Sequence, residues 1–179
     1  MLFRSMPAGE IDRGTADFLL CQPVTRTQVF VAESIGWLLS GVLILGSGCV
    51  GHVIASEFVH AEMRLPFASA LLVLGNLGAV YLAVGSLAFL LSACSDRRGR
   101  AVGIVFAILL LSFLLNFLAQ FQDWAKRISW LSIMEYYRPA IVIQNNQFPR
   151  ADVLTLLTLA AIWWTAALIV FRRRSICTV

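Results

Sequence analysis

Long apolar runs alternate with short charged stretches along most of this chain. Four runs stand out, and they cover residues 29–55, 66–93, 101–121 and 151–171. Only Glu33 and His52 interrupt the first run, and the second contains no charged residue. Each run has the roughly 20 residues that a helix needs to cross the apolar core of a bilayer. Because backbone N–H and C=O groups find no water there, such segments must be helical. The pattern therefore predicts an all-α, polytopic membrane fold with four transmembrane helices.

The residues before the first run follow a different pattern. Residues 10–26 carry both acids and arginines, which are costly to place in hydrocarbon, so this segment must lie in water beside the bilayer. Thr15 can cap a short helix, with Gly14 before it and Pro23 ending it. The apolar side chains of this stretch are Ile11, Phe18, Leu19, Leu20 and Val24. We expect a short amphipathic helix within residues 1–28, followed at once by the first span.

The segment between the third and fourth runs, residues 122–150, is also patterned. Trp124, Ile128 and Leu131 recur at helical spacing. The aromatic side chains of Trp130, Tyr136 and Tyr137 suit a membrane–water interface. We expect one or two short helices lying at the outer leaflet and ended by Pro139.

Composition and charge narrow the class of protein. Hydrophobic residues make up 59% of the chain and charged residues 13%, whereas a soluble domain has about 45–50% and about 25%. The net charge of +4 is better interpreted as membrane orientation than as nucleic-acid binding, because the arginines sit in short clusters between apolar runs.

The basic residues also predict the orientation. If both termini share one side, that side holds the larger and denser set: Arg4, Arg13, Arg26, Arg97, Arg98, Arg100, Arg172, Arg173 and Arg174. The other side holds Arg64, Lys126, Arg127, Arg138 and Arg150. Positive charge marks the cytoplasmic side. We therefore expect both termini, including the tail 172–179, in the cytoplasm and residues 122–150 outside.

Candidate chemistry is sparse. The chain has no Gly-x-x-x-x-Gly-Lys-Ser/Thr loop for phosphates and no assembled catalytic set, so we expect no enzyme activity and no cofactor of its own. His52, Glu57 and His60, with Glu62 and Met63, are possible metal ligands. Their spacing matches no metal motif, and interfacial polar residues are the favoured interpretation.

Polar and small residues inside the runs bear on helix packing. Four polar side chains lie in or near the spans: Asn76, Tyr81, Asn116 and Gln120. We expect them to form helix–helix hydrogen bonds rather than substrate contacts. Two rows of small residues, Ser47-Gly51-Ala55 and Gly75-Ala79, would let helices approach closely.

A family resemblance rests on three stretches. Glu10, Arg13-Gly14-Thr15, Leu19-Leu20 and Pro23-Val24-Thr25-Arg26 resemble the cytoplasmic signature of ABC-2 type ABC transporter permeases. Trp130-Leu131-Ser132 with Tyr136-Tyr137-Arg138-Pro139-Ala140, and Phe171-Arg172-Arg173-Arg174, are similar to later parts of that family. The resemblance implies that a coupling segment docks on an ATP-binding subunit through Glu10, Arg13, Gly14, Thr15, Asp17, Phe18, Leu19, Leu20, Pro23 and Arg26. The pattern alone favours an interfacial helix without a partner.

The resemblance further implies a function. By this resemblance, the protein would be the permease subunit of an ATP-driven transporter in a bacterial inner membrane, and by analogy an exporter. Expected partners are a separate ATP-binding subunit, which would bind the ATP, a second permease half (homo- or heterodimer) and membrane lipids, with no nucleic acid. Family members usually have six spans, and this sequence resembles the last four, so we expect a truncated sequence or a separate chain that supplies two. The alternative is a small membrane scaffold or assembly protein without transport. The sequence does not identify the substrate.

Overall fold

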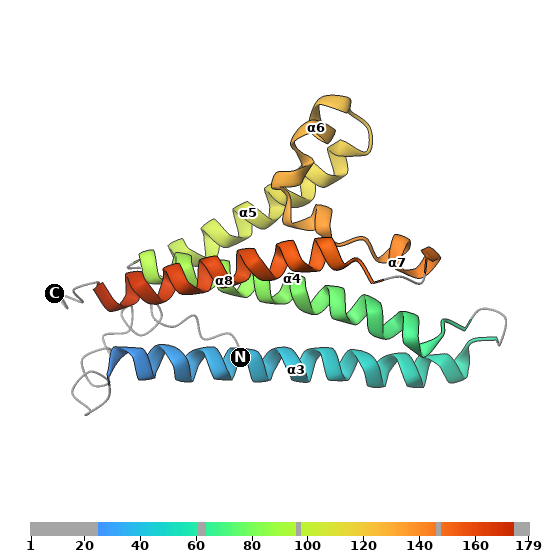
Figure 1. Cartoon of the computed structure of the whole chain (residues 1–179), viewed down its shortest axis with the longest axis horizontal. Coiled ribbons are helices and arrows are strands. Elements are labelled where there is room, and N and C mark those ends of the chain that lie inside the picture. The colour runs from blue at the N-terminus through green and yellow to red at the C-terminus, as the bar shows by residue number, and fades with distance from the viewer. Residues whose placement is uncertain (1–24, 61–63, 96–97, 146–147, 174–179) are drawn as a thin grey trace.

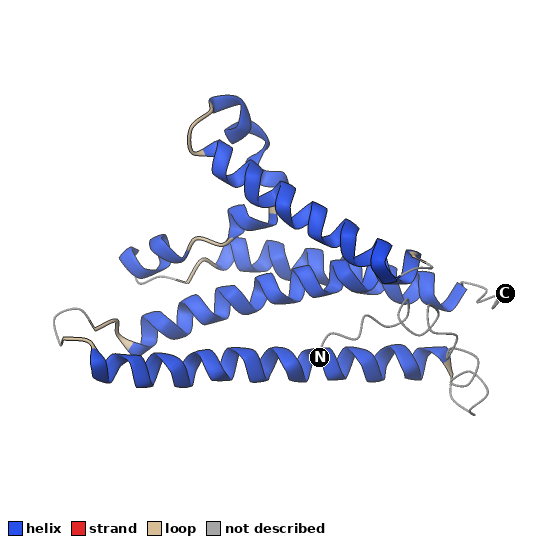
Figure 2. Cartoon of the chain, turned by 180° about the vertical axis from the view of Figure 1, so that it is seen from behind, coloured by secondary structure: helices blue, strands red, loops and turns tan. Residues whose placement is uncertain are grey.

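In the part of the chain that the structure describes, all regular secondary structure is helical. The computed structural model describes residues 25–60, 64–95, 98–145 and 148–173, and no strand occurs among them (Figure 2). In chain order the elements are α3 (Arg26–Phe58), α4 (Phe67–Cys94), α5 (Arg98–Ala119), α6 (Asp123–Ile128), two 3₁₀ turns η2 (Ser129–Leu131) and η3 (Ile133–Tyr136), α7 (Pro139–Asn145) and α8 (Arg150–Arg173).

The four predicted spans are confirmed as α3, α4, α5 and α8. Each of these helices is long and apolar enough to cross a membrane. The helix α3 extends beyond the predicted run at both ends, from Arg26 to Phe58. The helix α5 ends at Ala119, and Gln120 and Phe121 close a turn by donating to Phe117 and Leu118. The all-α, membrane-spanning fold class is therefore correct.

The core of the bundle lies between α4 and α8, which run side by side in the same direction (Figure 1). Small side chains permit this close approach, as in other membrane bundles. The main buried cluster combines Ala79, Val80, Ala83 and Leu87 of α4, Ile133 of η3, and Val153 and Leu156 of α8. This helix pair is the element on which the other helices pack.

The helices α3 and α5 lie outside this pair and expose much of their apolar surface. Leu43 of α3 is 73% exposed and Leu111 of α5 is 67% exposed. Such exposure suits a lipid environment, where apolar side chains need no protein cover. Figure 1 shows α5 separating from α4 and α8 toward its Ala119 end. The turn η3 packs into this space through Ile133.

The segment 122–150 differs from the prediction at Pro139. Three short helical elements precede this proline, and Pro139 itself begins α7, although we expected it only to end a helix. A proline suits the first position of a helix because its missing N–H has no partner there anyway and its φ is already helical. The carbonyl of Arg138 then accepts from the N–H of Val142 at 3.2 Å. Trp124 and Trp130 are exposed at this end of the bundle.

Candidate functional site

The predicted coupling residues fall almost entirely outside the described part of the chain. Arg26, the first residue of α3, is described. The other predicted residues are Glu10, Arg13, Gly14, Thr15, Asp17, Phe18, Leu19, Leu20 and Pro23, and they lie outside the described residues. Their role therefore stays a prediction. The structure does describe the point at which this segment enters the bundle.

The start of α3 is fixed by a capping box. The hydroxyl of Thr25 accepts from the N–H of Gln28 at 3.3 Å, and the Gln28 side chain accepts from the N–H of Thr25 at 2.8 Å. This reciprocal pair satisfies two backbone donors that a helix start would otherwise leave free. The Thr-x-x-Gln spacing was readable in the sequence, and it places the helix start three residues before the apolar run.

The N-terminal part of α3 is held against α4 and α8 by aromatic packing around Phe30. Phe30 is 3% exposed. Its ring centroid lies 5.5 Å from Phe89 of α4, 5.5 Å from Trp164 of α8 and 5.8 Å from Phe171 of α8. Aromatic pairs at these separations add about 0.5–1.5 kcal/mol beyond the area they bury. We call Phe30, Phe89, Trp164 and Phe171 the entry cluster.

A polar contact lies one turn beyond the entry cluster. The indole N–H of Trp164 donates to the Ser34 hydroxyl at 3.0 Å, and that hydroxyl donates to the carbonyl of Phe30 at 2.9 Å. Ser34 is buried at 4% exposure. The hydroxyl thus joins the backbone of α3 to the side chain of α8. Sequence reasoning missed Phe30, Ser34 and Trp164, because a run that is apolar on almost every side carries no clear periodic signal of the face that packs.

Tyr81 confirms the expectation of helix–helix hydrogen bonding. Its hydroxyl donates to the carbonyl of Trp37 at 2.8 Å and lies 2.8 Å from the Ser40 hydroxyl, so it joins α4 to α3. Its ring also stacks on Trp37, with centroids 5.6 Å apart. Asn116 forms a hydrogen bond as well, donating to the Glu135 carboxylate at 3.0 Å.

Asn76 does not meet that expectation. It is fully buried in α4, at 0% exposure, yet neither its Nδ2 nor its Oδ1 has a hydrogen-bond partner among the described residues. An amide buried without partners is destabilising by roughly 1–3 kcal/mol. Its packing position alone therefore gives no reason for an asparagine there.

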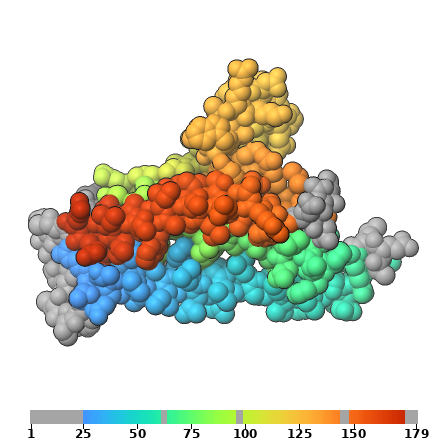
Figure 3. Space-filling view, viewed as in Figure 1, coloured from blue at the N-terminus to red at the C-terminus, as the bar shows by residue number. Residues whose placement is uncertain are grey.

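An apolar cleft of about 510 Å³ opens between α3, α4 and α8. Leu38 and Leu45 of α3, Gly78 and Leu82 of α4 and Leu157 of α8 contribute to its walls. In Figure 3 the surface is hollowed between the middle of α3 and the first half of α8. The lining suits an acyl chain or another apolar helix rather than a polar solute.

Comparison with known families decides the class of protein. The family model described as ABC-2 family transporter protein matches residues 5–176, nearly the whole chain. The chain belongs to the ABC-2 family of transporter proteins. No curated protein and no solved structure gave a match to it. This ABC-2 protein is an integral membrane protein and a permease-type subunit of a transporter. Members of the family are membrane transport components that generally dimerise and work with an ATP-binding subunit.

The possible metal ligands of this permease do not form a site in the described part of the chain. No group of three or more His, Cys, Asp or Glu side chains is arranged to hold an ion among the residues described. His52 instead lies near the ring of Phe67, with centroids 6.3 Å apart. Glu57 and His60 are exposed at the end of α3, while Glu62 and Met63 lie outside the described residues.

Proposed function

We propose that this permease is one membrane half of an ATP-driven exporter and that residues 10–26 couple it to a separate ATP-binding subunit. In this proposal ATP is bound and hydrolysed only by that subunit, and the permease needs no cofactor of its own. Both termini face the cytoplasm of a bacterium, and a second permease half completes the translocation path. The family match supports the transporter class, and the residue pattern supports the docking segment.

The entry cluster is the observation that carries this proposal. A movement of residues 10–24 would reach the bundle through the start of α3 at Arg26, only three residues after Pro23. Because Phe30 packs against Phe89, Trp164 and Phe171, a shift of the start of α3 would press on both α4 and α8. The helix α3 is unbroken over its whole length of 33 residues. Such an arrangement suits the transmission of force from a cytoplasmic partner into the membrane.

The docking surface itself follows from the chemistry of the segment. Phe18, Leu19 and Leu20 provide the apolar side chains, and Arg13 and Asp17 provide charges beside them. In protein interfaces, buried aromatic anchors dominate the binding energy, whereas charges at the rim mainly affect association rate and salt dependence. We therefore expect Phe18 to be the anchor.

The test uses complexes of the permease purified after co-expression with an ATP-binding subunit from the same organism. Phe18→Ala should cost about 2 kcal/mol or more of binding free energy, roughly a 30-fold weaker Kd. Arg13→Ala should instead change mainly the salt dependence of binding. Phe30→Ala should leave the partner bound but reduce the stimulation of its ATPase activity by the permease. Leu39→Ala, on the exposed side of α3, is the matched control and should change neither.

The outcomes separate this proposal from its alternative. If no ATP-binding subunit copurifies with the wild-type chain, a scaffold or assembly role is favoured. If Phe18→Ala binds the partner as the wild type does, the segment is only an interfacial anchor, and coupling must enter elsewhere. If the Phe30→Ala permease stimulates the ATPase activity as fully as the wild type does, the entry cluster has a structural role and does not transmit the movement of the ATP-binding subunit.

A further inference from the structure

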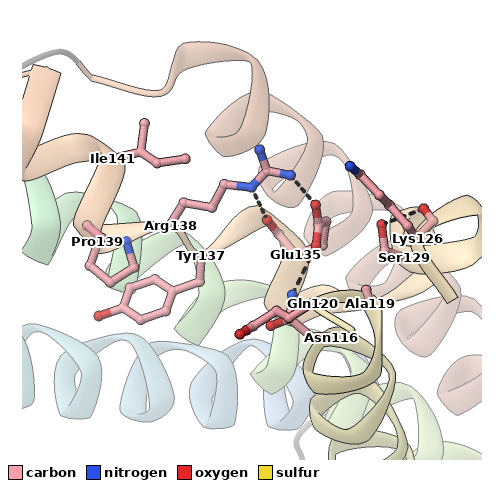
Figure 4. Close-up of a pocket in the computed structure, with 11 residues that line it drawn as sticks. Asn116, Ala119, Gln120, Lys126, Ser129, Glu135, Tyr137, Arg138, Pro139 and Ile141 are labelled. Carbon is pink, nitrogen blue, oxygen red and sulfur yellow. Dashed lines mark hydrogen bonds and ion pairs between the residues drawn. The ribbon is translucent and has the colours of Figure 1, made fainter. Parts of the chain in front are cut away.

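A polar pocket of about 390 Å³ lies at the end of the bundle remote from Arg26 and Arg173. It forms where α5 meets the segment from α6 to α7, and Figure 4 shows its lining side chains. Polar or charged groups come from α5, from the turn that follows it and from this segment: Asn116, Gln120, Lys126, Glu135, Tyr137 and Arg138. This concentration of polar groups contrasts with the apolar cleft between α3, α4 and α8.

The pocket is held in shape by contacts around Glu135. One carboxylate oxygen accepts from Nδ2 of Asn116 at 3.0 Å, and the other pairs with Nη2 of Arg138. Arg138 also donates from Nε to the carbonyl of Glu135 at 2.9 Å. Two of its three guanidinium nitrogens are thereby engaged, and Figure 4 shows the third directed away from Glu135. The Arg138 side chain is 46% exposed, so this donor is accessible to a ligand.

The charge of the pocket is positive. Lys126 lines it together with Arg138, whereas Glu135 is its one carboxylate among the described residues. The Lys126 ammonium has no ion-pair partner in the part of the chain that the structure describes. Its backbone is fixed by Ser129, whose hydroxyl donates to the Lys126 carbonyl at 3.1 Å. Lysine and arginine together, beside amide donors, are a common chemistry for binding phosphate.

The surroundings of the pocket are apolar and aromatic. Phe121 is 69% exposed, Trp124 57%, Trp130 63% and Leu131 61%. Tryptophans at the ends of membrane helices lie at the level of the lipid headgroups. A ligand in this pocket would therefore meet water or headgroups on one side and the acyl chain region on the other. A lipid can place its headgroup in the polar pocket and its acyl chains on the exposed aromatic side chains, whereas a free anion would contact only the pocket.

We propose that this pocket binds the anionic phosphate headgroup of a membrane lipid. Lys126 and the free donor of Arg138 contact the phosphate oxygens, and the acyl chains lie over the exposed aromatic side chains beside α6. The pocket thereby holds the α5–α7 segment at the membrane interface. The proposal does not depend on coupling through residues 10–26, so each can fail without the other.

The experiment measures binding by calorimetry to the purified chain in a non-ionic detergent. The probes are a short-chain phosphatidylglycerol, the matching phosphatidylcholine and inorganic phosphate. We expect the phosphatidylglycerol to bind, the phosphatidylcholine to bind at least about tenfold more weakly, and millimolar phosphate to compete. Lys126→Gln should weaken phosphatidylglycerol on the order of tenfold because it removes one of two cations from the phosphate. Among the described residues, the Lys126 side chain has no ion-pair partner whose loss would complicate the interpretation.

Arg127→Gln is the matched control. Arg127 is the neighbouring cation, it is exposed, and it is not part of the pocket. Its loss should change the affinity by no more than about twofold. Equal weakening by both glutamine variants would mean attraction to general surface charge and would overturn the proposal. Equal binding of both lipids would overturn it as well. If inorganic phosphate binds as tightly as the lipid, the pocket is a site for a free anion and the lipid assignment is wrong.

Discussion

Gly85 on α4 lies directly beneath the indole of Trp37 on α3, and this contact yields a sharp prediction. A Cβ atom added at Gly85 would lie 2.3 Å from Cζ2, 2.4 Å from Cε2 and 2.5 Å from Nε1 of Trp37, well short of the 3.4 Å at which ordinary contact begins. The indole cannot easily move aside, because it stacks on Tyr81 and meets the edge of Phe89 at 5.4 Å. Gly85→Ala should therefore push α3 away from α4.

The size of the effect follows from two opposing terms. Overpacking a filled contact costs typically about 1–3 kcal/mol. Replacing glycine by alanine within a helix recovers up to about 1 kcal/mol. We expect a net loss of about 1–2 kcal/mol in the free energy of unfolding. Gly51→Ala is the matched control, because a Cβ there meets no atom within 4 Å. That variant should be neutral or slightly more stable.

The assay is unfolding of the purified chain by sodium dodecyl sulfate in mixed micelles, followed by tryptophan fluorescence. Trp37 itself reports on the contact. The double variant Gly85→Ala/Trp37→Leu should lose less stability than the sum of the two single variants, because the smaller side chain removes the clash. If Gly85→Ala unfolds at the same detergent fraction as Gly51→Ala, Trp37 does not lie across Gly85, and the assigned packing of α3 on α4 is wrong.

Two further predictions concern the orientation and the buried amide. In a chain whose other cysteines are removed, a cysteine at Arg127 should be labelled by an impermeant maleimide added to intact cells, while Cys94 should react only after the cells are opened. The opposite pattern would reverse the proposed orientation. Asn76→Leu should raise the free energy of unfolding by about 1 kcal/mol or more, because it removes a buried amide that has no hydrogen-bond partner among the described residues. A destabilised variant would show that the amide has a partner in the membrane.

The four spans were predictable because the bilayer makes run length informative. A stretch of about 20 apolar residues has one stable conformation in hydrocarbon, and each predicted run became a helix. The packing faces were not predictable on the same grounds. Gly85 and Gly51 both lie in apolar runs, yet one sits against Trp37 and the other faces open space. In a span made almost entirely of apolar residues, the lipid-facing and protein-facing sides have nearly the same composition, so the sequence does not show which side packs.

The functional regions divide in the same way. Two features were predictable from residue spacing alone. The Thr25-x-x-Gln28 spacing indicates a capping box, and the i, i+3 spacing of Glu135 and Arg138 indicates an ion pair. The pocket as a whole was not predictable, because Asn116 reaches Glu135 across a separation of 19 residues that includes α6 and η2. The helix α7 was missed because a proline can either end or begin a helix. In the structure the carbonyl of Arg138 accepts from the N–H of Val142, so Pro139 begins one.

The α4–α8 pair connects the two ends of the molecule that carry its proposed roles. The entry cluster packs Phe30 against both helices at the Arg26 end, and the larger cluster packs Ile133 against both at the other end. Toward its Ala119 end, by contrast, α5 forms hydrogen bonds with η3 and with the residue that caps it. Ser132 donates to the carbonyl of Ser112 at 2.8 Å, and Asn116 donates to Glu135. A movement that enters through α3 therefore has a packed route to η3 along α4 and α8. If coupling enters through α3 as proposed, we expect its movement to reach the polar pocket around Glu135 by that route rather than along the lipid-exposed α5.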